Sequence, residues 1–162
     1  MRVIFLDIDG VINTLMISKE PFEYKERGCI ERDGYYYDLC NTHDGRVSNK
    51  QAVIWLDKIC KDYNLSIVLS STWRYDFEQA CECIYNTGLS KDIKIIGATP
   101  ILHQPRGNEI QAYLNEHPEI EDFIILDDDT DMCHLMDHLI QCDPDAGITN
   151  GTRIKISQYF KK

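Results

Sequence analysis

Two aspartates near the start of the chain are the first residues whose type and spacing can do chemistry. Asp7 and Asp9 follow an apolar run, Val-Ile-Phe-Leu, and Gly10 comes directly after them. Carboxylates this close repel each other unless a proton or a cation lies between them, and their oxygens suit a hard metal ion. The pair therefore predicts a magnesium site. A solvated acidic turn would have the same local sequence, so the prediction needs support from elsewhere in the chain.

A second acidic cluster follows another apolar run, Phe-Ile-Ile-Leu, later in the chain. It contains Asp127, Asp128, Asp129 and Asp131. Acidic residues at the start of a helix interact favourably with the helix dipole, which is the ordinary reason for such a cluster. This run holds more aspartates than capping a helix requires. If both apolar runs are parallel strands, the two clusters meet at the carboxyl edge of one sheet, where open α/β sheets bind ligands.

Hydroxyl groups and two arginines complete the set of candidate site residues. Ser70 and Ser71 follow the run Ile-Val-Leu and offer donors at the same edge, although a simple serine turn has the same composition. Arg106 stands just before a helical segment, where its fixed charge can offset an incoming phosphate. Arg74, close after Ser71, is the alternative cation. Arginine is most often a surface residue, so its type alone assigns neither of them.

The elements that must position these residues follow a regular pattern. Short apolar runs of strand length alternate with longer amphipathic segments, which is typical of a doubly wound α/β sheet. Near-continuous apolar runs fit strands that helices bury on both faces. The pattern predicts one Rossmann-like parallel sheet of about five strands, with helices on both faces. The expected strands cover residues 3–6, 66–69, 93–96, 123–126 and 138–141.

Recognisable end signals mark the helices between these strands. Ser48 and Gln51 form a predicted capping box before residues 52–63. Gly88 ends a second predicted helix, which begins near Asp76. Crossings of this length keep consecutive strands parallel. The remaining predicted helices cover residues 108–116, 130–137 and 152–160.

Residues 13–47 break the pattern, because they show no sustained helical or strand period. The segment is too long for an ordinary loop, so we expect a flap-like insertion within a single domain of residues 1–162. Asp33-Gly34 separates two short β-prone runs and predicts a hairpin. The tyrosines at 35–37 follow that turn. Their rings are expected either to cover the substrate or to pack the flap against the sheet.

Length and composition limit the classes of protein to which this chain can belong. A chain of 162 residues with 43% hydrophobic content can bury one core. The formal net charge of −10 argues against an extended duplex partner, but a small phosphorylated substrate or a nucleotide end needs only local cations. The N-terminal residues fit neither a signal peptide nor a membrane span. We therefore expect a cytoplasmic protein with seven reduced cysteines and no membrane partner.

In order along nearly the whole chain, these motifs resemble those of the haloacid dehalogenase (HAD) superfamily of phosphohydrolases. Phe-Leu-Asp-Ile-Asp-Gly-Val-Ile-Asn resembles motif I, Ile-Val-Leu-Ser-Ser motif II, and Ile-Ile-Leu-Asp-Asp motif IV. The region of Arg106 resembles motif III, where lysine is usual, and Arg74 competes for that assignment. Closer similarity is to small capless members, namely polynucleotide phosphatase domains and the HAD domains grouped with Swiss Army Knife RNA-repair proteins.

The resemblance implies the catalytic roles. Asp7 would attack phosphorus and form an aspartyl-phosphate, while Asp9 would protonate the leaving oxygen and later accept a proton from water. Ser70 and Arg106 would hold the transferring oxygens. Mg²⁺ would neutralise the repulsion between the nucleophile and the substrate. The implied metal-binding residues are Asp7, Asp9 through its carbonyl, Asp127 and Asp128, and the implied substrate-binding residues are Gly10, Ser71, Arg74 and Asp131.

The expected function is therefore magnesium-dependent hydrolysis of a phosphate monoester. The main alternative is the processing of polynucleotide ends, which differs in substrate rather than in chemistry. A phospho-receiver domain would need an aspartate at the end of its third strand, where this chain has Ile-Lys-Ile-Ile-Gly-Ala-Thr-Pro. A degenerate domain that only binds ions is the other alternative, but every acidic position of the motifs is present. The sequence names no particular substrate and no oligomeric state.

Overall fold

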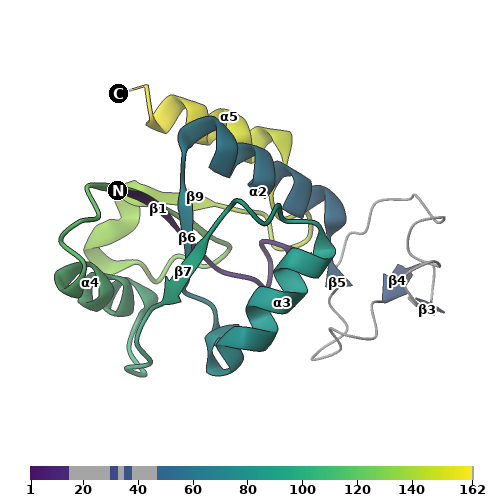
Figure 1. Cartoon of the computed structure of the whole chain (residues 1–162), viewed down its shortest axis with the longest axis horizontal. Helices are drawn as coiled ribbons and strands as arrows, with labels where there is room; N and C mark the ends of the chain where they lie inside the picture. Colours follow the sequence, from purple (N-terminus) through teal and green to yellow (C-terminus); the bar gives the residue numbers. More distant parts are fainter. Residues whose placement is uncertain (15–29, 33–34, 38–46, 162) are drawn as a thin grey trace.

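A parallel sheet forms the centre of the molecule in a computed structural model, which describes residues 1–14, 30–32, 35–37 and 47–161 (Figure 1). Its five strands lie in the order β7-β6-β1-β8-β9, and each neighbouring pair is parallel. The predicted α/β fold with a Rossmann-like sheet is therefore confirmed. The strands are β1 (Arg2–Leu6), β6 (Ser66–Leu69), β7 (Ile95–Ala98), β8 (Asp122–Asp127) and β9 (Leu139–Gln141).

The strand order creates a switch point between β1 and β8. From β1 the chain adds β6 and β7 on one side, and it then returns to add β8 and β9 on the other. The connections that follow β1 and β8 therefore diverge, and doubly wound sheets bind ligands at such a point. The register pairs Leu6 with Leu126, and the backbone N–H of Asp7 donates to the carbonyl of Leu126 at 2.9 Å. Asp7 and Asp127 thus emerge side by side.

Helices cover both faces of the sheet, as predicted. Alternate residues of β1 enter different cores: Ile4 and Leu6 join one, and Val3 and Phe5 join the other. The first core is completed by α2 (Lys50–Tyr63), α3 (Phe77–Thr87) and α5 (Asn150–Tyr159), and Figure 1 shows α2 and α5 side by side. The second core is completed by α4 (Arg106–Glu116) and the 3₁₀ helix η2 (Cys133–His138).

Several predicted boundaries shift in the structure. Asn49, not Ser48, caps α2, because its side-chain oxygen accepts from the backbone of Gln51 at 3.0 Å and of Ala52 at 3.2 Å. Strand β7 starts later than predicted, at Ile95. The predicted helix over 130–137 is the 3₁₀ helix η2, and Cys133 at its start has a φ of 52°, which an α-helix does not accommodate.

The base of the insertion after β1 is a short antiparallel ribbon. Strand β2 (Asn13–Thr14) pairs with β5 (Val47–Ser48), so the chain leaves and re-enters the domain at one place. The predicted hairpin is confirmed by the antiparallel pairing of β3 (Ile30–Arg32) with β4 (Tyr35–Tyr37). The turn residues Asp33-Gly34, the tyrosine rings and the predicted closure of a flap over the site lie outside what the structure describes.

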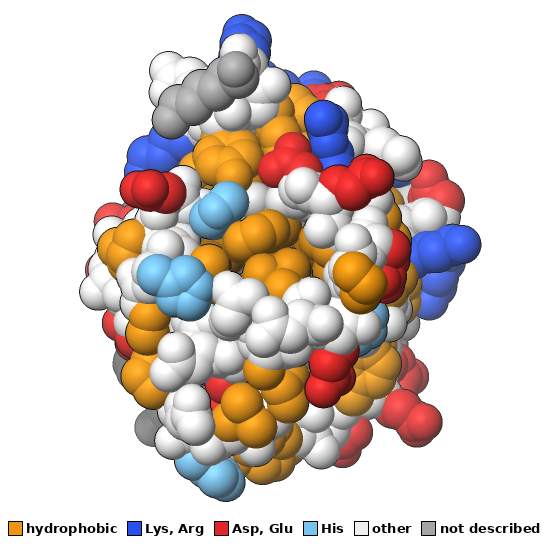
Figure 2. Space-filling model, turned by 90° about the vertical axis from the view of Figure 1, so that its left-hand side faces the viewer, with side chains coloured by type: hydrophobic (Ala, Val, Ile, Leu, Met, Phe, Trp, Pro, Cys, Tyr) orange, Lys and Arg blue, Asp and Glu red, His pale blue; other side chains and the backbone are white. Residues whose placement is uncertain are grey.

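Charged side chains are dispersed over the face of the molecule shown in Figure 2. On that face the Lys and Arg side chains lie scattered toward the rim, while apolar side chains occupy much of the middle. Aromatic rings in the described residues stack on histidines in two places, Tyr113 on His117 and Phe123 on His138.

None of the described helices combines the length and the apolar character that crossing a bilayer requires.

Candidate active site

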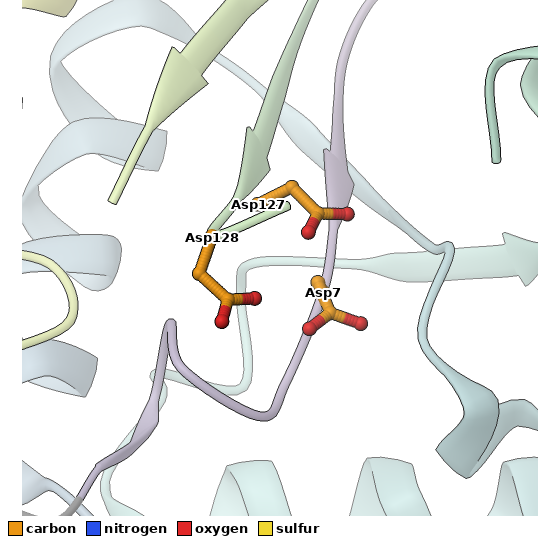
Figure 3. Close-up of side chains that lie close together, drawn as sticks. All are labelled: Asp7, Asp127 and Asp128. Atoms are coloured by element: carbon orange, nitrogen blue, oxygen red, sulfur yellow. The ribbon is translucent and has the colours of Figure 1, made fainter. Parts of the chain in front are cut away.

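Three carboxylates gather at the switch point of the sheet. Asp7 follows β1, Asp127 ends β8, and Asp128 is the next residue. Their side chains face a common space in Figure 3, and one oxygen atom from each lies within 4.8 Å of the others. The structure therefore brings together three of the residues predicted to bind metal.

Asp7 is nearly buried between positive and negative neighbours. One carboxylate oxygen accepts a hydrogen bond from a guanidinium nitrogen of Arg106 at 2.7 Å. Burial raises the pKa of Asp7, and the charge of Asp128 adds to the rise, while the charge and hydrogen bond of Arg106 and a hydrogen bond from Ser71 oppose it. The ionised form that a nucleophile needs thus depends on nearby cations.

Asp127 supplies the atom that fits a metal ion best. One of its oxygens accepts from the backbone of Asp129 at 2.9 Å, whereas the other has no hydrogen-bond partner although it is fully buried. Arg106 lies 3.1 Å from this second oxygen, close enough for charge attraction but without hydrogen-bond geometry. Burial and the charge of Asp7 raise the pKa of Asp127 to about 7. An oxygen-only donor set with an unpartnered buried atom suits Mg²⁺.

Gly10 makes room for the third carboxylate. Its φ is 76°, and a Cβ atom at this position would overlap the carboxyl group of Asp128. Any other residue would therefore be strained in its backbone and would displace Asp128. The sequence predicted a contact between Gly10 and substrate, whereas the described structure supplies a different reason for the glycine.

The carboxylate of Asp9 lies outside the group of three. One oxygen accepts from the indole nitrogen of Trp73 at 2.9 Å and the other from the side-chain amide of Asn13 at 3.2 Å. The metal role predicted for Asp9 used its backbone carbonyl, so it does not depend on the side chain. Trp73 and Asn13 were not predicted as site residues, although Asn13 ends the stretch that resembles motif I and Trp73 lies two residues after the stretch that resembles motif II.

Arg106 enters the site from the first turn of α4. Its own backbone N–H donates to the carboxylate of Asp131 at 2.8 Å, and the N–H of Gly107 donates to the carbonyl of Asp131 at 3.1 Å. Asp131 thereby anchors the start of the helix that carries Arg106. The predicted contact between Asp131 and substrate stays a prediction, because the described contacts of the Asp131 carboxylate are with the backbone at the start of α4.

Ser70 and Ser71 lie buried at the end of β6, beside β1. The backbone of Ser70 donates to the carbonyl of Leu6 at 2.9 Å, and its hydroxyl has no hydrogen-bond partner among the described residues. Ser71 caps the 3₁₀ helix η1 (Thr72–Asp76), which begins directly after it. A buried hydroxyl without a partner is available to a bound oxygen.

Arg74 forms a buried ion pair rather than reaching the carboxylates. Its guanidinium group pairs with Glu109 of α4, and one nitrogen donates to the carbonyls of Ser70 and Ser71 at 2.8 and 2.7 Å. The other oxygen of Glu109 accepts from the backbone of Leu102 at 2.8 Å. Sequence analysis missed Glu109, and its position one helical turn after Arg106 was the available signal.

Comparison with known proteins gave a match to one protein family. Neither the curated proteins nor the solved structures gave a significant match. The profile of one family, described as the HAD domain in Swiss Army Knife RNA repair proteins, matches residues 3–152. This span includes all five strands of the sheet except the first residue of β1, and it includes all the site residues described above. The chain therefore belongs to this family of HAD domains, within the HAD superfamily of phosphohydrolases.

Proposed function

We propose that the protein is a magnesium-dependent phosphatase that hydrolyses a phosphate monoester through an aspartyl-phosphate on Asp7. The observation that carries the proposal is the buried group of Asp7, Asp127 and Asp128, with the guanidinium of Arg106 at 2.7 Å from Asp7. A nucleophile, a cation site and a fixed positive charge are the parts that phosphoryl transfer requires.

The proposed reaction has two steps, and each step replaces one bond to phosphorus with another. A carboxylate oxygen of Asp7 forms a bond to phosphorus, and the bond from phosphorus to the leaving oxygen breaks as Asp9 gives that oxygen a proton. Water then attacks phosphorus while Asp9 takes its proton, and the bond to Asp7 breaks to release inorganic phosphate. Asp9 suits this task because Trp73 and Asn13 fix its carboxylate in one orientation.

Asp7, Asp127 and Asp128 would hold the metal ion. When bound, Mg²⁺ supplies positive charge that offsets the repulsion between Asp7 and the phosphate. Arg106 and the buried hydroxyl of Ser70 would bind the non-bridging oxygens of the phosphoryl group. Arg106 already lies between two carboxylates, so it is oriented before substrate arrives.

A second candidate function is the removal of phosphate from the end of an RNA. It is favoured by the family to which the chain belongs, whose description names RNA repair proteins. Turnover of a nucleoside monophosphate compared with that of a phosphate-ended oligonucleotide separates the two functions, because the chemistry at Asp7 is the same in both.

The nucleophile is tested by Asp7→Asn, assayed with an activated aryl phosphate in the presence of Mg²⁺. We expect less than a tenth of wild-type turnover with only a modest change in melting temperature, one decade being about 1.4 kcal/mol of barrier. Asp129→Asn is the matched control, because Asp129 belongs to the same acidic run but is exposed and outside the group of three. Higher turnover in Asp7→Asn, or equal losses in both variants, would show that Asp7 is not the nucleophile.

The metal is tested with a chelator and with Asp127→Ala. We expect turnover to stop when Mg²⁺ is removed, and to fall when Ca²⁺ replaces it because the larger ion accepts looser geometry. Asp127→Ala should require a much higher Mg²⁺ concentration for half-maximal rate. A rate that survives chelation would reject the metal-dependent mechanism.

A further inference from the structure

A pocket of about 280 Å³ is lined by Asp9 and by residues that follow β6. The 3₁₀ helix η1 and the first turns of α3 supply most of its wall. Its described lining residues are Asp9, Thr72, Trp73, Tyr75, Asp76 and Gln79. This volume is slightly below the usual range for ligand pockets, which begins at roughly 300 Å³, so the pocket suits one compact ring system.

Asp9 connects this pocket to the reaction. In the proposed mechanism Asp9 gives its proton to the leaving oxygen, and the same residue forms part of the pocket wall. Its carboxylate is fixed on that side by the indole nitrogen of Trp73 at 2.9 Å. A leaving group that takes its proton from Asp9 would therefore lie beside the pocket.

The lining indicates what kind of leaving group fits. Trp73 and Tyr75 are aromatic, and Tyr75 is 66% exposed, so its ring is available for stacking. Thr72 and Gln79 offer hydroxyl and amide groups that can hydrogen-bond the edge of a heterocycle. No Lys or Arg is found among the described lining residues, whereas Asp9 and Asp76 are acidic. This combination favours an uncharged, planar, hydrogen-bonding ring and disfavours another phosphate.

We propose that this pocket binds the nucleoside part of the substrate, with its base against Tyr75 and Trp73. The inference rests on the proposed phosphatase function and adds the leaving group that the site selects. The nucleoside that carries the scissile phosphate occupies the pocket, and no further phosphodiester enters it. A mononucleotide and a phosphate-ended oligonucleotide share this nucleoside, so both are tested.

The catalytic experiment compares adenosine monophosphate with ribose 5-phosphate, which lacks the base. Wild-type protein should prefer the nucleotide in kcat/KM, and Tyr75→Ala should reduce that preference about tenfold because a stacking partner is lost. Tyr75→Phe keeps the ring and should keep the preference. Turnover of ribose 5-phosphate should differ much less among the three proteins, because this substrate has no base to stack on Tyr75. An unchanged preference in Tyr75→Ala overturns the proposal.

A phosphate-ended dinucleotide provides the second arm. If the acidic lining excludes an additional phosphodiester from the pocket, a dinucleotide whose second phosphate must enter it should be turned over at least tenfold more slowly than the mononucleotide. Equal or faster turnover of the dinucleotide overturns this part of the proposal and assigns the pocket to a polynucleotide end.

A binding experiment separates this proposal from the proposed function. The chain has two tryptophans, so Trp55→Phe leaves Trp73 as the sole indole reporter. Adenosine, which carries no phosphate, should change the fluorescence of Trp73, and Tyr75→Ala should weaken its binding about tenfold. Ribose should cause no change. Adenosine binding in a protein that turns over no phosphate ester would reject the phosphatase function but support the pocket, whereas phosphatase activity without adenosine binding would reject the pocket.

Discussion

Arg74 and Arg106 reach the same edge of the sheet, yet the structure uses their charges differently. The Arg74 side chain is 6% exposed, and its two terminal guanidinium nitrogens bind Glu109 and the carbonyls of Ser70 and Ser71, while its Nε has no hydrogen-bond partner among the described residues. Arg106 is 17% exposed and faces Asp7 and Asp127. Two nitrogens of the Arg74 guanidinium group are engaged in contacts within the fold, whereas the partners of Arg106 are the groups that are proposed to react or to bind metal.

The difference shows how one helix can serve both stability and catalysis. Arg106 and Glu109 stand one turn apart on α4, so the ion pair that Glu109 makes with Arg74 holds the helix that presents Arg106. Arg74 also holds the backbone at Ser70 and Ser71. We therefore infer that Arg74 is a positioning residue and that Arg106 acts on the phosphate directly. Each prediction below tests one side of this division.

The largest expected effect is on stability, from Arg74→Ala. Removing one partner of a buried ion pair leaves the other charge uncompensated, which typically costs about 3–5 kcal/mol. Urea denaturation should show a loss of that order in the free energy of unfolding. Arg2→Ala, which removes a half-exposed ion pair with Asp122, is a control that should change stability much less. If Arg74→Ala is as stable as the wild type and only KM rises, Arg74 contacts substrate instead.

Arg106→Ala should have the largest effect on catalysis. Removing a positioned cation from a transferring phosphoryl group lowers the rate about 10²–10³-fold, or about 2.7–4 kcal/mol. In the presence of Mg²⁺, its free energy of unfolding should fall less than that of Arg74→Ala. Arg106→Lys keeps the charge at the position where HAD domains usually have lysine, and it should recover much of the rate. A rate above a tenth of wild type in Arg106→Ala would show that another cation fulfils this role.

A double-mutant cycle should sharpen the division between the two arginines. Glu109→Gln keeps an acceptor for the backbone of Leu102 but removes the charge opposite Arg74. The coupling energy between Arg74 and Glu109, measured by denaturation, should be about 0.5–3 kcal/mol. Arg106 and Glu109 make no ion pair among the described contacts, so their effects should add within about 0.5 kcal/mol. Similar coupling in both pairs would remove the distinction.

Much of this arrangement follows from simple rules about strands. Because parallel strands end at one edge, the positions of Asp7 and Asp127 after apolar runs were enough to predict that they meet. The sequence could not separate Arg74 from Arg106, since both lie in connections that follow strands ending at that edge and their partners are set by packing. The pair formed with Glu109 depends on how α4 crosses the sheet, which no local pattern encodes.

Short elements and caps were harder to predict for a similar reason. Ser48 and Asn49 are both good capping residues, and the pairing of Ser48 within β5 leaves Asn49 to cap α2. The acidic run around Asp131 looked like the start of a helix over residues 130–137, but the chain there turns to hold α4 before forming η2. Contacts between distant segments decide such cases.

The smallest expected effect, from Asp131→Ala, tests whether the start of α4 matters for catalysis. The variant removes the carboxylate that accepts from the backbone of Arg106, and an exposed capping interaction of this kind is worth roughly 0.5–1 kcal/mol. We expect a small loss in melting temperature and a modest fall in kcat, because Arg106 becomes less well held. Asp129→Ala, in the same acidic run, is the control and should leave kcat unchanged. If Asp131 instead binds substrate, as the sequence predicted, KM should rise while kcat and stability stay the same. That result would assign Asp131 to the phosphate site. The ion pair of Arg74 with Glu109 would then be the contact that holds α4 in place.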